Sequence, residues 1–247
     1  MDKETIKFYN DNKDKSWKLP PIPDNLKTNY EIARWIFTQN IGWLKIDIDF
    51  DLNGWKKDIE NINDYFVPHR NQESEGWRSC CIHGLGIDKT ENSVAYGFED
   101  EMNAPYGWTE LSEKTPHVVD FFKNIFPCDS YKRIRFMELL PNGYIQEHGD
   151  VPDEFEETDD LDPMDFGIPL NIAVIHPDNC FMPFKEKGIL PYKEGEMYIP
   201  NVAEKHAFLN FSNTRRIHII ADCIPGSKKE QYAELLVRSY RKQFDAQ

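Results

Sequence analysis

The sequence lacks the features of a membrane-spanning or disulfide-bonded secreted protein. No apolar run reaches the roughly 18 residues that a membrane-spanning helix needs. Cysteines are few, odd in number and never spaced as CxxC, so reduced thiols are the simplest interpretation of Cys80, Cys81, Cys128, Cys180 and Cys223. The charged residues Met1–Thr5 contain no apolar stretch of the signal-peptide type. We therefore expect a cytoplasmic protein with no membrane span.

Positive charge is also scarce. Lysine and arginine number 29 against 43 aspartates and glutamates, which gives a formal net charge of −14. A surface of this sign disfavours nucleic acid and anionic membranes as partners. It suits a cationic substrate, and equally a protein whose charge serves only solubility. With 247 residues, 40% of them hydrophobic, the chain is long enough for one large domain or for a core with an added helical part.

Strand patterns fill the middle of the chain and helical patterns flank it. Leu44, Ile46, Ile48 and Phe50 alternate with polar residues, which predicts a half-buried strand. Further strands are expected at 77–86, 134–140 and 172–175, with a Pro-Asn-Gly turn at 141–143. Apolar residues at helical spacing or helix-boundary signals predict helices at 29–37, 54–65, 118–125 and 229–244.

The stretch after the predicted turn carries a possible metal site. On an extended backbone, residues two apart project to the same face, so His148 and Asp150 point an imidazole and a carboxylate at one spot. A His-x-Asp pair with a distant histidine forms the 2-His-1-carboxylate triad, which holds Fe(II) and leaves positions open. By itself the His-x-Asp pair is common by chance.

A second motif lies near the other end of the chain. His206 is followed by a short polar turn, and Arg216 opens the next apolar stretch ten positions later. An arginine is suited to a carboxylate because its planar guanidinium binds both oxygens at once. This pairing resembles the 2-oxoglutarate-dependent Fe(II) oxygenases, in which the distal histidine ligand and the arginine that binds the 5-carboxylate of 2-oxoglutarate have this spacing.

From about Trp77 to Pro225 the chain resembles the aspartyl/asparaginyl β-hydroxylase branch of that superfamily, which also includes bacterial proline hydroxylases. The matching segments are 135–150, 171–180 and 195–200, the last running into 206–222. The resemblance implies a mainly β fold with flanking helices around a double-stranded β-helix (jelly-roll, cupin-like) core. It implies Fe(II) on His148, Asp150 and His206, with 2-oxoglutarate and O2 as cosubstrates. It also implies that Arg216 anchors the 5-carboxylate and that Asn171 lies near the 1-carboxylate.

The sequence departs from the animal aspartyl hydroxylases at two positions. Those enzymes lack the carboxylate ligand, whereas Asp150 is present here, as in the proline hydroxylases. Met137 stands where they carry a serine that helps to bind 2-oxoglutarate. The resemblance therefore implies the cosubstrate and leaves the substrate open between an Asp, Asn or Pro residue of a protein or peptide and a free amino acid or other small molecule.

Four other side chains are candidates for substrate or cosubstrate contacts. The resemblance implies that Met137 faces the pocket, and Arg135 shares its strand face. We therefore expect Arg135 to point into the pocket and to meet either a ligand or an internal acid in a structural ion pair. His83 lies on a predicted strand, 77–86, that resembles strands beside the barrel mouth of related small hydroxylases, although a structural role suits it equally. Trp108 follows a loop rich in tyrosine and acidic residues and is a further candidate. His218 lies two residues from Arg216 on the same predicted strand face.

We expect three parts: an N-terminal extension at 1–75, an oxygenase core at 76–226 and a C-terminal helix at 227–247. The segment 151–168 is acidic and contains no basic residue. It is either a lid that recruits a basic peptide or a solvated charge run. Two functions of other classes remain open on the same fold: a metal enzyme that works without 2-oxoglutarate, and a non-catalytic cupin-like binding module.

Overall fold

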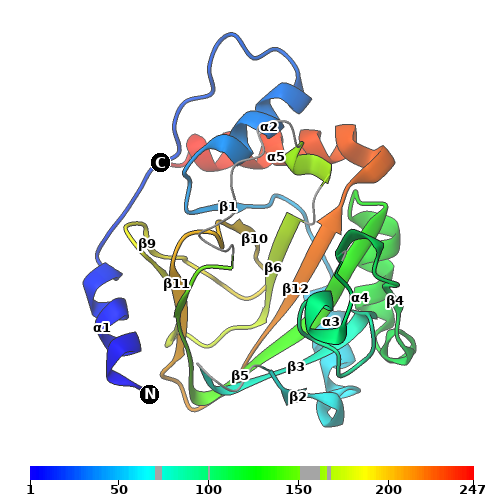
Figure 1. Cartoon of the computed structure of the whole chain (residues 1–247). Helices are drawn as coiled ribbons and strands as arrows, with labels where there is room; N and C mark the ends of the chain where they lie inside the picture. The colour runs from blue at the N-terminus through cyan, green and yellow to red at the C-terminus, as the bar shows by residue number, and fades with distance from the viewer. Residues whose placement is uncertain (70–73, 100, 151–161, 166–167) are drawn as a thin grey trace.

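A computed structural model of the chain describes residues 1–69, 74–99, 101–150, 162–165 and 168–247. The strands within these residues form one sheet in the order β1-β10-β6-β12-β5-β11-β8-β9, with β3 also paired to β5. The pairs are antiparallel, and Figure 1 shows the sheet curled into a barrel-like shape. The strands are β1 Trp43–Lys45, β2 Val67–Pro68, β3 Ser74–Gly84, β4 Gly107–Trp108, β5 Ser130–His148, β6 Ile168–Ile175, β7 Cys180–Phe181, β8 Pro183–Phe184, β9 Gly188–Ile189, β10 Met197–Pro200, β11 His206–Asn210 and β12 Arg216–Ile224. This is the expected mainly β fold with a double-stranded β-helix core.

The helices lie outside the sheet. In Figure 1, α2 and α5 lie side by side across one end, α3 and α4 lie at the side, and α1 stands alone near the N-terminus. The α-helices are α1 Lys3–Asn12, α2 Asn29–Thr38, α3 Leu52–Glu60, α4 Pro116–Asp120 and α5 Lys229–Phe244, and a π-helical turn at Phe121–Ile125 continues α4. Short 3-10 turns occupy 63–65, 93–96, 101–103, 110–113, 163–165 and 226–228.

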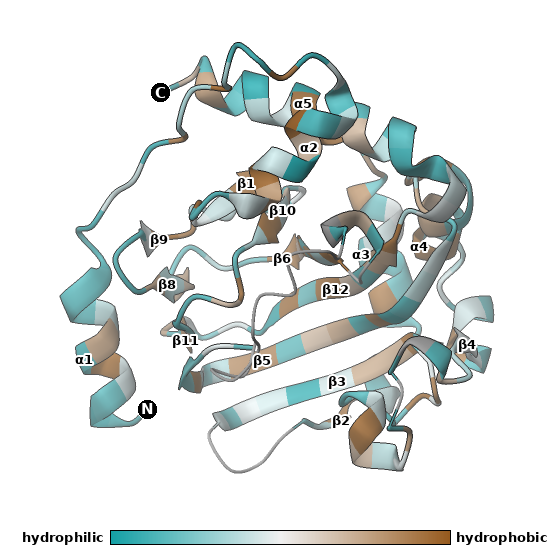
Figure 2. Cartoon of the chain, turned by 45° about the horizontal axis from the view of Figure 1, so that its top comes forward, coloured by the Kyte–Doolittle hydropathy of each residue, from teal (hydrophilic) through white to brown (hydrophobic). Residues whose placement is uncertain are grey.

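Two of the three hydrophobic clusters among the described residues are large. The larger joins the sheet to the helices and runs from Leu19 to Tyr240, so residues of all three predicted parts share one core. The smaller lies inside the curl and includes Leu139, Phe184 and Phe208. Figure 2 shows hydrophobic and hydrophilic residues alternating along β5 and β12, as strands with two different environments require.

The predicted turn at 141–143 is wrong, because β5 continues through it as a kinked strand. The strand pairs with β12 up to Leu139 and with β11 from Tyr144. Asn142 has a left-handed φ of 60°. A Cβ on Gly143 would lie 2.8 Å from the carbonyl oxygens of Glu75 and Leu140, so only glycine fits there. The kink lets one strand carry Arg135 on one wall of the curl and His148 on another.

The predicted strand at 44–50 is too long. Only Trp43–Lys45 pairs with β10, and the ladder ends where Ile46 donates its N–H to the Met197 carbonyl. Asp47 then turns to α5, where its N–H donates to Ser239 and its carboxylate pairs with Arg238 and Lys242. Tertiary contacts with a helix almost 200 residues away therefore override the local alternation.

Candidate functional site

Two adjacent strands bring the three predicted metal ligands together. His148 is the last residue of β5 and His206 the first of β11, and the antiparallel register places them directly opposite each other. Their ring centroids are 4.4 Å apart, and His148 Nε2 lies 3.5 Å from Asp150 Oδ1. One ligand atom from each of the three residues falls within 4.8 Å of the others.

Backbone carbonyls fix both imidazoles in the same way. His148 Nδ1 lies 2.8 Å from the Gln146 carbonyl, and His206 Nδ1 lies 2.9 Å from the Glu204 carbonyl. A carbonyl can only accept, so each Nδ1 carries the proton and each Nε2 presents a lone pair. The backbone N–H of Asp150 donates to the Val202 carbonyl at 2.8 Å, which holds the carboxylate residue beside the two rings.

The site has a buried side and an open side. His206 is 1% exposed and stacks on Phe184, whereas the Asp150 side chain is 44% exposed. Burial, with the adjacent His148, lowers the pKa of His206 to about 4, so its ring is neutral at physiological pH. Two neutral imidazole nitrogens and one carboxylate are the donors of the 2-His-1-carboxylate Fe(II) sites, so this donor set fits Fe(II).

Arg216 is buried and forms no ion pair with the acidic residues that the structure describes. It is 1% exposed, and no carboxylate of the described residues lies within 4.0 Å of its guanidinium. Its Nε has no hydrogen-bond partner there either. Burial lowers the pKa of Arg216, while Cys180 and Tyr192 act in the opposite direction. A buried cation without a counter-ion is costly, so this guanidinium fits an anionic ligand such as the 2-oxoglutarate carboxylate.

One ring, Phe208, connects the triad to Arg216. The centroid of the Phe208 ring lies 5.9 Å from the centroid of the His206 ring and 4.6 Å from the guanidinium carbon of Arg216. The metal ligands and the buried cation therefore border one apolar wall. Sequence reasoning missed Phe208, although its position two residues after His206 on a strand was the available signal.

His218 and Asn171 join Arg216 rather than the triad. Nδ1 of His218 lies 2.7 Å from Arg216 Nη2 and 2.7 Å from the Asn171 side-chain amide. Its Nε2 lies 2.9 Å from His176 Nδ1. The structure thus places His218 at the Arg216 end of the site, and the proximity of Asn171 to a 1-carboxylate stays a prediction.

Arg135 meets a structural acid. Its Nη1 donates to the Thr90 carbonyl at 2.9 Å, and its Nη2 lies 3.8 Å from Asp222. Arg133 binds the same carboxylate more closely, at 2.9 Å. The internal ion pair that was one of the two alternatives is therefore present, and a ligand contact by Arg135 stays a prediction.

His83 and Trp108 are not brought to the triad. They pair across β3 and β4 with ring centroids 5.0 Å apart, and Lys123 of the turn after α4 lies over Trp108. The register of β3 shifts between Cys81 and His83, and the centroid of the histidine ring lies 6.3 Å from that of Tyr131. Burial lowers the pKa of His83, as for a packed structural histidine. The predicted lid cannot be compared, because 151–161 and 166–167 lie outside the described residues.

Comparison with known proteins places this geometry in a family. A family model described as aspartyl/asparaginyl beta-hydroxylase matches residues 46–225. The chain belongs to this family. The protein is accordingly a 2-oxoglutarate- and Fe(II)-dependent hydroxylase, as the sequence resemblance implied. None of the curated proteins is similar enough to the hydroxylase to count as a match.

Solved structures similar to the hydroxylase are distant in sequence. A viral collagen prolyl hydroxylase from Paramecium bursaria Chlorella virus-1, in complex with 2OG, is 17% identical, with 74% of this chain and 95% of that chain covered and a TM-score of 0.42. A prolyl-4-hydroxylase from Pseudomonas putida is 10% identical, with 78% and 97% covered and a TM-score of 0.43. A Trichoplax adhaerens prolyl hydroxylase bound to a hypoxia inducible factor peptide is 10% identical, with 83% and 96% covered and a TM-score of 0.44. None of the helices that the structure describes is both long and apolar enough to cross a bilayer.

Proposed function

We propose that His148, Asp150 and His206 hold the Fe(II) of this hydroxylase and that Arg216 binds the far carboxylate of 2-oxoglutarate. The observation that carries the proposal is the fully buried Arg216 guanidinium, which has no carboxylate partner among the described residues and shares the Phe208 ring with a metal ligand. When bound, Fe(II) supplies O2 activation and C–H hydroxylation, with 2-oxoglutarate converted to succinate and CO2.

The side chains of this protein supply orientation and a dry environment. The two backbone-anchored imidazoles keep their Nε2 lone pairs aimed at one point before any ligand arrives. Phe184 and Phe208 exclude water from the buried side. In such surroundings the charge of Arg216 interacts strongly with a carboxylate, because solvent screening is weak. The open Asp150 side leaves room for the substrate.

The substrate we propose is an amino-acid residue of the Asp, Asn or Pro type in a protein or peptide with basic neighbours. The net charge of −14 supports this choice, because a peptide carrying lysine or arginine is attracted to an acidic enzyme. The alternative is a free amino acid, which needs no extended binding surface.

The test measures succinate formed from 2-oxoglutarate with Fe(II), ascorbate and air. Wild type is compared with His206→Ala and with His117→Asn, a control in which a histidine outside the triad is replaced. We expect iron-dependent succinate in wild type and control and none in His206→Ala. Basic peptides, acidic peptides and free amino acids are then added separately. Stimulation by basic peptides that weakens with salt supports the proposed substrate, whereas stimulation by a free amino acid alone overturns it.

A further inference from the structure

The partner of Arg216 is unusual for a buried guanidinium. Four other arginines with limited exposure contact carboxylates: Arg78 and Arg215 contact Glu138, and Arg133 and Arg135 contact Asp222. Arg216 is the most deeply buried of the five, and its short side-chain contact is to an imidazole, 2.7 Å from Nη2 to His218 Nδ1. His218, which contacts this cation, is therefore either neutral or, if protonated, positively charged like Arg216.

Hydrogen-bond chemistry decides between these two states. A guanidinium has donors and no acceptor, so the 2.7 Å contact requires a lone pair on His218 Nδ1. The proton of the neutral ring is then on Nε2, which donates to His176 Nδ1 at 2.9 Å. The atom of Asn171 that lies 2.7 Å from the same Nδ1 is Oδ1, which can only accept. A half-turn of the amide, which exchanges two nearly isosteric groups, brings its NH2 to the ring, where it shares the Nδ1 lone pair with Arg216.

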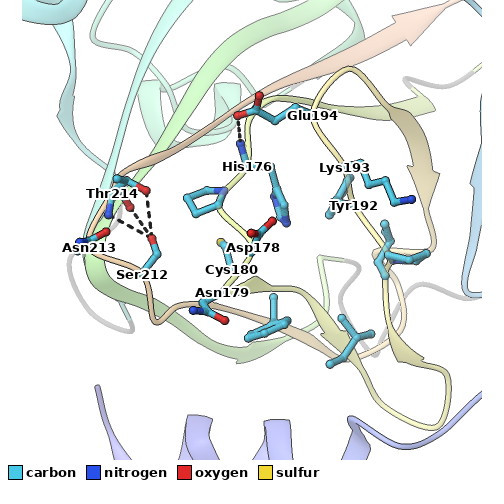
Figure 3. A pocket seen from close by; sticks show the side chains of 15 residues that line it. His176, Asp178, Asn179, Cys180, Tyr192, Lys193, Glu194, Ser212, Asn213 and Thr214 are labelled. Carbon is cyan, nitrogen blue, oxygen red and sulfur yellow. Dashed lines mark hydrogen bonds between the residues drawn. The ribbon is translucent and has the colours of Figure 1, made fainter.

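His176 is able to accept the hydrogen bond from His218 Nε2. Burial, reinforced by Arg216, lowers the pKa of His176 to about 4, so its ring is also neutral and its Nδ1 can accept. The ring of Tyr192 packs on both histidines, with centroids 5.3 Å from His176 and 4.6 Å from His218. His176 and Tyr192 line a pocket of about 760 Å³ that also contains Cys180 and Glu194 (Figure 3).

A neutral acceptor and a carboxylate would orient Arg216 equally well but would leave different charges. A carboxylate would neutralise the guanidinium and compete with an incoming anion. A neutral imidazole removes rotational freedom from the side chain and leaves its full positive charge. We infer that His218, held by His176, is a positioning residue that orients Arg216 while keeping its charge uncompensated, so that the affinity for a dicarboxylate cosubstrate is set there. This inference rests on the proposed role of Arg216.

The test replaces His218 in three ways and measures 2-oxoglutarate binding directly. Calorimetry is done on the Mn(II)-loaded protein without O2, and the KM for 2-oxoglutarate and kcat are measured separately. His218→Asn keeps an acceptor near the position of Nδ1, so we expect a dissociation constant within about threefold of wild type. His218→Leu removes the acceptor, and we expect weakening by roughly tenfold or more. His218→Asp keeps an acceptor but neutralises the cation, and we expect weakening by roughly 100-fold.

The order of the variants separates positioning from packing. The inference is overturned if His218→Asn and His218→Leu weaken 2-oxoglutarate binding equally. It is also overturned if His218→Asp binds 2-oxoglutarate as tightly as His218→Asn does. If thermal melts show that His218→Asp is unfolded, the comparison of His218→Asn with His218→Leu decides the question. Arg216→Ala is measured beside them. If Arg216→Ala binds 2-oxoglutarate as wild type does, the proposed role of Arg216 is rejected. If Arg216→Ala binds 2-oxoglutarate weakly and every His218 variant keeps the wild-type affinity, only the inference about His218 is rejected.

Discussion

Replacing Arg216 by methionine should make the ligand-free protein more stable and the cosubstrate weaker. An uncompensated buried charge costs roughly 3–5 kcal/mol. The guanidinium carbon of Arg216 lies 4.6 Å from the centroid of the Phe208 ring. A desolvated cation over an aromatic ring is stabilised by about 2 kcal/mol, which offsets part of the cost of burying the charge. The difference leaves a gain of about 1–3 kcal/mol on substitution, because the cost of burying the charge exceeds the contribution of the ring contact. Methionine has a similar length and no charge, so it fills the same space.

Thermal melts with and without 2-oxoglutarate measure both effects. A gain of 1 kcal/mol raises the melting temperature of a domain of this size by about 2–4 °C. For wild type, 2-oxoglutarate at 100 times its dissociation constant adds about 2.7 kcal/mol, and the Arg216→Met variant should show almost none of this increase. The ligand-free variant should nevertheless melt above wild type.

The adjacent Arg215 provides the matched control. Its side chain is 33% exposed and lies 3.1 Å from Glu138. Arg215→Met should therefore lose a little stability and keep the full stabilisation by 2-oxoglutarate. An Arg216→Met protein that melts well below wild type without ligand would show that Arg216 stabilises the empty fold, and the reasoning from uncompensated charge would be refuted.

Three further predictions concern other ionisable groups. Glu138 is 1% exposed and contacts two arginines at 3.0 and 3.1 Å, so Glu138→Ala should lower the free energy of unfolding by roughly 3–5 kcal/mol in urea melts; a loss below about 1 kcal/mol would contradict this. The hydrogen bond to Asp58 raises the pKa of His117, so the stability from this pair is complete below the unfolded pKa and disappears as pH rises through the raised folded value. Asp58→Asn should return the NMR-measured pKa of His117 toward its ordinary value, and an unchanged value would exclude this partner. Burial raises the pKa of Cys180 to about 11, so a thiol reagent should label it slowly in the native protein and rapidly in denaturant; equal rates would disprove its burial.

The site was predictable where the chemistry depends on residues that are close in the sequence. His148 and Asp150 lie two residues apart, and the ten-residue spacing between His206 and Arg216 crosses one short turn. Both relations are local, so the sequence contains them. Family resemblance then supplied the Fe(II) and 2-oxoglutarate that spacing alone leaves open.

The rest depends on long-range register. Phe208 borders the triad and Arg216 because β5 kinks at Asn142 and changes its partner from β12 to β11. His83 contacts the rings of Trp108 and Tyr131 and follows a register shift of β3 after Cys81. The contact between His176 and His218 joins β12 to the residue that follows β6. A kink, a register shift and a contact between separate strands leave no regular pattern in the sequence.

The most direct test of the central claim is anaerobic Fe(II) binding followed by 2-oxoglutarate titration in three proteins. Wild type should bind one Fe(II) per chain and then 2-oxoglutarate. His206→Ala should lose Fe(II), and Arg216→Met should bind Fe(II) as wild type does but take up 2-oxoglutarate far more weakly. Wild-type Fe(II) binding in His206→Ala, or wild-type 2-oxoglutarate binding in Arg216→Met, would contradict the assignment of that residue.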